Sequence, residues 1–354
     1  MRPSCLFRFD ASTAIGGGHA VRCLALAQAM AQEGWDCRFA YREGTAETVP
    51  TLAAIGQPAI RLTGPESAEP AALSAALPEG VTLLVVDHYE RGRAYERACR
   101  GWAQHIAALD DRPTRPHDCD ILIDPTLGRE AADYRSLVPA GCTLLTGTDY
   151  AILRPAFARA RKRALERRGT PKPVQRILVS FGMADPENLS GLALAAIAES
   201  GLHAAVDVVL GAEALHRAAI EAAHRALPGG GAVHAYVEDM AALMLEADFA
   251  IGAAGSSAWE RCCLGLPTLH FVLADNQHDI ALGLEQRGAA ENLGPPDGGA
   301  ADRLAARIAA LGRQPEALAQ MGRAAAAVCD GQGSGRLIEA FAALSNAHAS
   351  RPLA

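Results

Sequence analysis

Residues 15–19 read Ile15-Gly16-Gly17-Gly18-His19 and stand between a short apolar run and a run rich in alanine and leucine. The apolar run, Cys5–Phe9, predicts a β-strand. The run that follows His19 carries apolar residues at helical spacing, which predicts an α-helix. The three glycines allow a tight turn and let the backbone approach a ligand closely. The stretch therefore predicts a strand, a glycine turn and a helix, the unit from which parallel α/β sheets are built.

In an open α/β sheet this turn lies at the carboxyl end of a strand, where ligands bind. The free N–H groups and positive end of the helix face the turn, and an imidazole there can act as a general base near neutral pH. His19 is therefore a candidate base. The stretch is neither a dinucleotide fingerprint nor a phosphate loop, because it lacks G-x-G-x-x-G and a following Gly-Lys-Ser/Thr. Taken alone, it fits a glycine turn with a helix-capping histidine equally well.

The composition narrows the class of protein. The 354 residues are enough for two domains. A net charge of −7 argues against a nucleic-acid-binding surface. The nine cysteines form no C-x-x-C pair and several lie in apolar runs, which is typical of buried thiols in a reducing compartment. No apolar run reaches transmembrane length and no leader pattern is present, so we expect a soluble cytoplasmic protein.

Strand and helix signals alternate along the chain, which predicts parallel sheets covered by helices on both faces. The further strands expected in the first half are 36–41, 59–62, 82–87, 105–111, 120–124 and 143–147. The run 82–87 is continuously apolar, as in a strand buried on both faces, and it ends in Asp87-His88-Tyr89. If the strands share one sheet, these polar residues lie near the glycine turn. The alternative is an aspartate that caps the next helix, with the histidine and tyrosine exposed.

A charged and then proline-rich segment, 161–173, lacks an apolar face and predicts an interdomain linker. We therefore expect an N-terminal domain over 1–160, a C-terminal domain over 174–333 and a final helix within 334–354. The second domain repeats the alternation, with strands expected at 176–182, 207–211, 233–237, 248–252 and 267–274, and a helical remainder.

Polar turns follow neighbouring strands of the second half. Gly255-Ser256-Ser257 offers hydroxyls and helix N-terminal amides that suit a diphosphate. Glu260, one turn further on, is placed to accept both hydroxyls of a ribose, or is a solvated glutamate beside a serine N-cap. Asp275-Asn276-Gln277 follows the next strand, and amide side chains suit the hydroxyl or acetamido groups of a sugar. Together these turns favour a nucleotide site.

With these residues in hand, the sequence resembles the UDP-2,4-diacetamido-2,4,6-trideoxy-β-L-altropyranose hydrolases of pseudaminic acid biosynthesis. The motifs that carry the resemblance run in order along nearly the whole chain: Phe9-Asp10, Ile15-Gly16-x-Gly18-His19, Arg22-Cys23-Leu24, Val86-Asp87-His88-Tyr89, Ser180-Phe181-Gly182-x-x-Asp185-Pro186-x-Asn188, Ile251-Gly252-x-x-Gly255-Ser256-Ser257-x-Trp259-Glu260, Leu266-Pro267, Asn276-Gln277 and Asp330-Gly331-x-Gly333. The wider class is the GT-B nucleotide-sugar fold that these hydrolases share with the MurG-type N-acetylglucosaminyltransferases.

The resemblance implies an α/β protein of the GT-B fold, in which two Rossmann-like domains with parallel sheets face each other across a cleft. It implies that the last helix, from about Ser334, packs on the first domain. It implies cleavage of the C1–O bond by water with inversion, with His19 as the base. The substrate-binding residues that it implies are Gly17, Gly18, Asp87, His88, Tyr89, Asn276 and Gln277. The UDP-binding residues that it implies are Phe181, Gly182, Gly255, Ser256, Ser257 and Glu260.

The implied partner is a small UDP-sugar substrate, not a nucleic acid. No cofactor or metal is implied, because UDP is a good leaving group and the chain lacks a clear metal-ligand motif. Two alternatives stay open: a MurG-like transferase and a non-catalytic nucleotide-sugar-binding protein. The transferase would favour a basic, apolar membrane-facing patch on the first domain, and no such run precedes residue 161. The sequence leaves the oligomeric state open.

Overall fold

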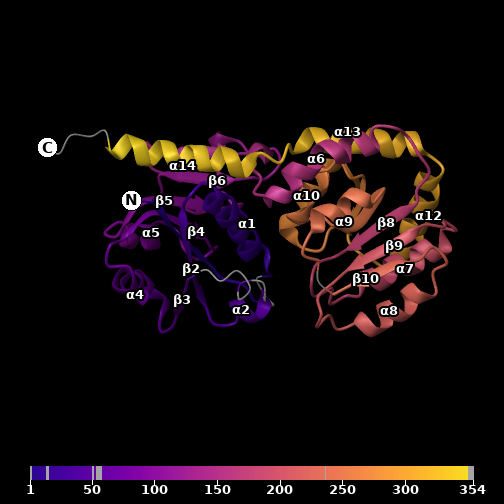
Figure 1. Ribbon diagram of the computed structural model, residues 1–354, viewed down its shortest axis with the longest axis horizontal. Coiled ribbons are helices and arrows are strands. Elements are labelled where there is room, and N and C mark those ends of the chain that lie inside the picture. Colours follow the sequence, from indigo (N-terminus) through magenta and orange to yellow (C-terminus); the bar gives the residue numbers. More distant parts are fainter. Residues whose placement is uncertain (1, 13–15, 50–51, 53–57, 236, 350–354) are drawn as a thin grey trace. The chain divides into compact units, whose positions relative to one another are not determined.

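The computed structural model describes residues 2–12, 16–49, 52, 58–235 and 237–349, with the backbone alone at residues 276 and 346–349. Ile15, the first residue of the glycine stretch, lies outside the described part. The chain forms two compact units (Figure 1). Unit 1 is drawn from residues 1–155 and 332–354, and unit 2 from residues 156–331.

Unit 1 is built on a parallel sheet of seven strands in the order β3-β2-β1-β4-β5-β6-β7. These strands are β1 (Ser4–Phe9), β2 (Asp36–Arg42), β3 (Ala59–Leu62), β4 (Val81–Asp87), β5 (Ala103–Leu109), β6 (Ile121–Asp124) and β7 (Thr143–Thr146). The strand order reverses between β1 and β4, and open α/β sheets bind ligands at the carboxyl edge of such a switch point. The glycine stretch follows β1 and Asp87 ends β4, so both lie at this edge.

Helices cover both faces of this sheet. Successive residues of a strand point to opposite faces, so Phe7 packs in the same core as α1 (Gly18–Gln32) and α14 (Gly333–Ala349), while Leu6 packs in the core of α4 (Glu69–Ala76) and α5 (Arg93–Cys99). Helix α14 comes from the end of the chain and lies in unit 1 against α1 (Figure 1). The shorter helices of this unit are α2 (Thr45–Thr48), η1 (Glu66–Ala68), η2 (Ala131–Asp133) and η3 (Thr148–Tyr150).

Unit 2 repeats this plan with a parallel sheet of six strands in the order β10-β9-β8-β11-β12-β13. These strands are β8 (Arg176–Ser180), β9 (Ala205–Val209), β10 (Gly231–His234), β11 (Phe249–Ala253), β12 (Thr268–Phe271) and β13 (Glu291–Asn292). Its helices are α6 (Pro155–Arg168), α7 (Leu189–Glu199), α8 (Arg217–Arg225), α9 (Met240–Glu246), α10 (Ser257–Cys263), η4 (Asp275–Gln277), α11 (His278–Gln286), α12 (Ala300–Gly312) and α13 (Pro315–Val328). The order reverses between β8 and β11, so the turns after these two strands flank the switch point of unit 2.

The predicted alternation of strands and helices is confirmed, and the predicted strands agree with the observed ones to within three residues at each end. Several elements are absent from the prediction, among them α2, α5, α6 and the short helices η2 and η3. Strand β13 is absent too, and it interrupts a remainder that we expected to be helical. Strand β13 has only two residues, so it leaves no alternating pattern in the sequence.

The segment 161–173 is not a linker over its first half, because α6 runs through it and belongs to unit 2. The segment was expected to lack an apolar face, and within it α6 buries Ala164 and Arg168, in line with Phe157 earlier on the same helix. Its arginines contribute to packing through their guanidinium groups. Arg161 donates to the backbone carbonyls of Cys263, Ala326 and Cys329, and Arg168 to those of Met244, Leu245, Ala247 and Leu264. A charged helix is therefore tied to its own unit by hydrogen bonds that hydropathy does not reveal.

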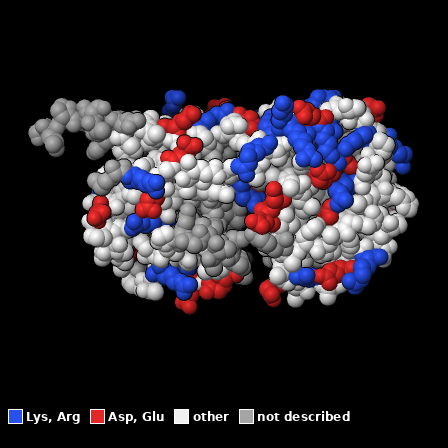
Figure 2. Space-filling model, in the orientation of Figure 1, with Lys and Arg blue, Asp and Glu red and all other residues white. Residues whose placement is uncertain are grey.

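The surface carries acidic and basic side chains side by side, with a gathering of Lys and Arg around α6 (Figure 2). Exposed residues of this helix include Arg159, Lys162 and Arg163. In the part of the chain that the structure describes, no helix is both long and apolar enough to cross a membrane. All nine cysteines are free thiols, and eight of them are buried.

Candidate functional site

The glycine stretch brings His19 to the carboxyl edge of the sheet of unit 1. Gly16 has φ +78°, a left-handed conformation that favours glycine. Gly17 is the N-cap of α1, and no side chain of the described residues caps this helix, so its first amides remain available. His19 stands in the first turn of α1 and is 7% exposed. The imidazole therefore lies just inside the surface, beside the free helix amides.

His19, Asp87 and Arg22 form one hydrogen-bonded cluster. His19 Nδ1 lies 2.5 Å from Asp87 Oδ1, and Arg22 donates to both oxygens of Asp87 at 2.5 and 2.6 Å. Burial alone would raise the pKa of Asp87, but the charge of Arg22 and the contact with His19 outweigh it and hold that pKa well below its usual range. An ionised Asp87 accepts from Nδ1–H. His19 Nε2, which has no hydrogen-bond partner among the described residues, is thereby left as the basic nitrogen.

The predicted proximity of the 87–89 segment to the glycine turn is confirmed for Asp87 and Tyr89. The ring of Tyr89 meets the His19 ring edge-on, with centroids 4.8 Å apart. Its hydroxyl donates to Asp111 Oδ2 at 3.2 Å, and the Arg112 guanidinium lies 4.0 Å from the centre of its ring. Burial and the charge of Asp111 raise the pKa of Tyr89 to about 12, so its hydroxyl stays protonated at neutral pH. The Tyr89 side chain thus packs against the His19 ring and is held in place by its contacts with Asp111 and Arg112.

His88 belongs to a different cluster, a buried ion-pair network that includes Asp10, Arg8 and Glu69. Its Nε2 lies 3.1 Å from Asp10 Oδ2, and its Nδ1 accepts from the backbone N–H of Glu90. Asp10 in turn pairs with Arg8, which also pairs with Glu69. Both ring nitrogens of His88 are therefore engaged within the protein, which does not favour the predicted contact with substrate.

In unit 2, the carboxyl ends of β8 and β11 pair at the switch point, with Gly252 in register with Ser180. A Cβ at Gly252 would lie 2.5 Å from the carbonyl oxygen of Ser180, so this position requires glycine. Gly182, directly after Phe181, has φ +98°. The ring of Phe181 is buried against Phe271, so only its backbone is available at the turn.

The predicted diphosphate turn lies between β11 and α10. Ser256 is the N-cap of α10, and Ser257 is its first residue. The Ser257 hydroxyl accepts from Nη1 of the buried Arg261 at 2.9 Å. Nη2 of the same guanidinium donates to the carbonyl of Ala253, the last residue of β11, at 2.6 Å. The arginine therefore ties the end of the strand to the start of the helix.

The remaining predicted residues of unit 2 lie around this turn. Glu260 is half-buried, one turn into α10. Gln277 accepts from the backbone N–H of Leu273, and its Nε2 would lie 3.7 Å from a Cβ at Gly255. Gln277 and Gly255 are thus neighbours in unit 2. The side chain of Asn276 lies outside the described part of the chain.

The residues of these clusters that are missing from the predicted site include Arg22, Asp111 and Arg261. Arg22 follows His19 by three residues on a predicted helix, a spacing that puts two side chains on one face. That spacing is a signal that would have found it. Arg261 likewise follows Ser257 by four residues on a predicted helix, whereas Asp111 carries no comparable local signal, because its partner Tyr89 lies 22 residues away.

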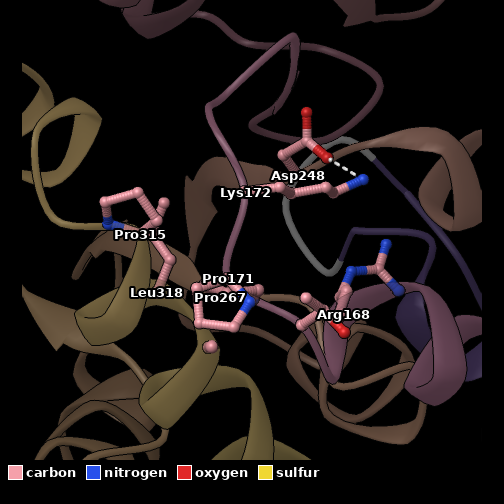
Figure 3. Close-up of a pocket in the computed structure, with 9 residues that line it drawn as sticks. Arg168, Pro171, Lys172, Asp248, Pro267, Pro315 and Leu318 are labelled. Atoms are coloured by element: carbon pink, nitrogen blue, oxygen red, sulfur yellow. Dashed lines mark ion pairs between the residues drawn. The ribbon is translucent and has the colours of Figure 1, made fainter.

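A small pocket of unit 2 is lined by Arg168, Lys172 and Asp248 together with prolines and Leu318 (Figure 3). Two of its lining residues, Asp248 and Pro267, directly precede β11 and β12, so it opens at the amino ends of these strands. Lys172 pairs with Asp248 there at 3.0 Å. In the ranges that the structure describes, no group of three or more His, Cys, Asp and Glu side chains is arranged to hold a metal ion.

No model of a protein family matches the chain. Among curated proteins, the chain is similar to the UDP-2,4-diacetamido-2,4,6-trideoxy-beta-L-altropyranose hydrolase of Campylobacter jejuni, with 30% identity over 186 residues that cover 52% of this chain and 62% of that protein. It is also similar to the spore coat polysaccharide biosynthesis protein SpsG of Bacillus subtilis, with 33% identity over 166 residues, or 45% of this chain and 46% of that protein. The chain thus matches between about half and three-fifths of the length of these relatives.

Among solved structures, MurG of Acinetobacter baumannii superposes with a TM-score of 0.68 over 97% of this chain and 100% of that chain, at 16% identity. A structural match at this sequence identity identifies the fold and does not identify the activity. Together with the seven- and six-stranded parallel sheets, it shows that the chain has the GT-B fold.

Proposed function

We propose that this protein is a nucleotide-sugar hydrolase that removes UDP from UDP-2,4-diacetamido-2,4,6-trideoxy-β-L-altropyranose. The observation that carries the proposal is the His19–Asp87 pair at the switch point of unit 1, in which Asp87 holds Nδ1 and leaves Nε2 basic. The similarity to the hydrolase of Campylobacter jejuni supplies the substrate class. The motifs on which the sequence resemblance rests lie in both units, which supports the proposal.

In this mechanism His19 Nε2 takes a proton from a water molecule as its oxygen attacks C1 of the sugar. The new O–C1 bond forms as the bond between C1 and the phosphate oxygen breaks, and the electron pair of that bond leaves with UDP. Attack opposite the leaving group inverts the anomeric carbon. Asp87, kept ionised by Arg22, stabilises the imidazolium that His19 becomes. UDP needs no proton to leave, so a single base suffices.

The geometry changes the roles of two predicted substrate-binding residues. Both carboxylate oxygens of Asp87 are engaged by His19 and Arg22, so we propose that Asp87 positions the base and does not contact the sugar. His88 is engaged with Asp10 and the Glu90 backbone and has no direct part in the proposal. Tyr89, the Gly17 and Gly18 amides, Asn276 and Gln277 remain the proposed substrate contacts. The proposed UDP contacts are the Phe181 backbone, Gly182, Gly255, Ser256, Ser257 and Glu260.

The second candidate is a UDP-sugar transferase, which the likeness of the fold to MurG favours. The two reactions share the donor and differ in the acceptor. The test is to incubate the protein with the UDP-linked 2,4-diacetamido sugar, without an acceptor, and to follow UDP release and anomeric configuration by NMR. Prompt release of the inverted free sugar is expected. An active, folded protein that releases UDP only when an acceptor is added would establish the transferase instead, and binding without turnover would establish a binding protein.

A further inference from the structure

Two of the free cysteines of unit 1 are in contact, at the amino ends of β6 and β7. Cys119 Sγ lies 3.7 Å from Cys142 Sγ, although the two residues are 23 positions apart in the chain. The pairing of the strands brings them together, since Ile121 is in register with Thr143 and the Thr143 N–H donates to the Asp120 carbonyl. Both cysteines pack in the core that also holds α4 and α5.

This pair can be reached from the solvent through one of its two thiols. Cys142 is partly exposed, whereas Cys119 is 1% exposed and the other seven cysteines are also buried. Cys5 and Cys37 provide a contrast. They are in register on β1 and β2, but they are 0% and 3% exposed, so a reagent in solution reaches neither.

The contact between the two thiols makes them chemically unequal. The thiolate is the reactive form of a cysteine. The hydrogen bond with the Cys119 thiol lowers the pKa of Cys142, because it stabilises the Cys142 thiolate. The same contact, together with burial, raises the pKa of Cys119. Cys142 is therefore the thiol that reacts first, and Cys119 is placed to react second.

We propose that Cys142 and Cys119 form a modification site at which a low-molecular-weight disulfide produces a protein disulfide. The Cys142 thiolate attacks one sulfur of the reagent, whose S–S bond breaks, and the other half of the reagent leaves as a thiolate. Cys119 then loses its proton and attacks Cys142 Sγ, and the second half leaves as a thiolate. One disulfide is reduced to two thiols while two cysteines are oxidised to one disulfide.

The second step requires little movement of the two sulfurs. A disulfide bond is about 2.05 Å long, so Cys119 Sγ and Cys142 Sγ have to approach each other by about 1.7 Å. No other reactive group is needed, because the buried thiol is already in contact with the sulfur that it attacks.

The disulfide would close a covalent ring around the segment that supports the loop after β5. Within this ring, Arg129 and Tyr134 donate to the backbone carbonyls of Asp111 and Asp110, respectively. A crosslink restricts the unfolded chain, so oxidation should make unit 1 more resistant to unfolding. The inference goes beyond the proposed function and does not depend on it, because it uses no residue of the proposed sugar or UDP contacts.

The test treats the full chain with an excess of glutathione disulfide, labels the remaining thiols under denaturing conditions and maps the peptides by mass spectrometry. Wild type is expected to lose two of its nine thiols and to yield a peptide pair joined through Cys119 and Cys142. Its Tm should rise by about 5 °C, and dithiothreitol should reverse both changes.

Three variants separate the two steps. Cys119→Ala should stop at the mixed disulfide, with one glutathione retained on Cys142, and Cys142→Ser should not react. Cys37→Ala is the matched control, because it removes a buried cysteine that also neighbours a cysteine on the next strand. This control should form the disulfide as wild type does.

Wild type that keeps all nine thiols, or that retains glutathione on Cys142, would overturn the inference. A disulfide between other cysteines would overturn it as well, and an unchanged Tm after oxidation would contradict the stabilising role. If Cys119→Ala does not fold, Cys142→Ser and the peptide map of wild type still decide the matter. Failure of the reduced protein to release UDP would count against the proposed function alone.

Discussion

His19 Nδ1 lies 2.5 Å from Asp87 Oδ1, although the two residues are 68 positions apart in the chain. The contact exists because β1 and β4 are neighbours in the sheet, with Phe9 in register with Asp87, and because α1 begins directly after the glycine turn. One side chain comes from the start of a helix and the other from the end of a strand. Their meeting fixes which nitrogen of His19 is basic.

The first prediction concerns Asp87→Asn. An amide beside Arg22 turns its carbonyl toward the guanidinium and its NH₂ toward His19, so Nδ1 becomes the acceptor and Nε2 carries the proton. We expect the rate of UDP release to fall by about 10²–10⁴-fold, the range of a general base, with UDP affinity unchanged. Steady-state kinetics together with ¹⁵N NMR of the His19 tautomer measure both effects. A variant with the Nε2–H tautomer and an undiminished rate would remove His19 from the role of base.

The second prediction concerns the stability of unit 1. The Glu69 side chain is buried and accepts from Arg8, Arg42 and Arg91. Burial alone would raise the pKa of Glu69, but these arginines lower it to about 2. Glu69→Gln removes the buried carboxylate that Arg8 and Arg91 share and leaves them Asp10 and the exposed Glu66 respectively, so the free energy of unfolding should fall by about 3–5 kcal/mol. Urea denaturation of the full chain measures it.

Glu66→Gln is the control for this variant. Glu66 also pairs with Arg91, but its side chain is 56% exposed. An exposed ion pair contributes about 0–1 kcal/mol, so this control should unfold close to wild type. Equal losses in the two variants would show that burial of the network does not set its contribution.

The third prediction is a pH dependence of stability that His117 governs. Its Nδ1 lies 2.7 Å from Glu96 Oε1 and its Nε2 3.1 Å from Asp110 Oδ2. Burial alone would lower the pKa of His117, but these two carboxylates raise it to about 9. The imidazolium therefore adds stability that is fully present below about pH 6.5, the unfolded pKa, and is lost as the pH rises through about 9. Over this window the loss should be about 3 kcal/mol.

His117→Asn separates this group from the rest of the protein. The variant should be less stable than wild type at pH 6.5, and its free energy of unfolding should change less between pH 6.5 and pH 9. Denaturant titrations at a series of pH values give both slopes. Parallel slopes for the two proteins would mean that His117 is not an imidazolium in the folded state.

The sequence alone predicts the strands of the parallel sheets and the proximity of Asp87 to His19. Apolar runs such as 82–87 mark buried strands, and parallel strands end at one edge, so the proximity of Asp87 to the glycine turn follows from pattern alone. Interactions between distant elements are not encoded in such patterns. Asp111 accepts a hydrogen bond from the Tyr89 hydroxyl, and Glu69 accepts from arginines of β1, β2 and the loop between β4 and α5. The sequence pattern predicts a linker where α6 lies, because the helix is rich in arginine. Two of these arginines, Arg161 and Arg168, attach the helix to its unit by donating to backbone carbonyls, which a hydropathy pattern does not reveal.

The measurement that tests the central claim most directly is turnover of the UDP-linked 2,4-diacetamido sugar in H₂¹⁸O, with the released UDP analysed by mass spectrometry. Water attack at C1 leaves every oxygen of UDP in place, so the account predicts unlabelled UDP and a sugar that carries the new oxygen. His19→Ala should slow this release by about 10²–10⁴-fold. UDP that gains one ¹⁸O would mean attack at phosphorus, and it would contradict both the reaction and the role of His19.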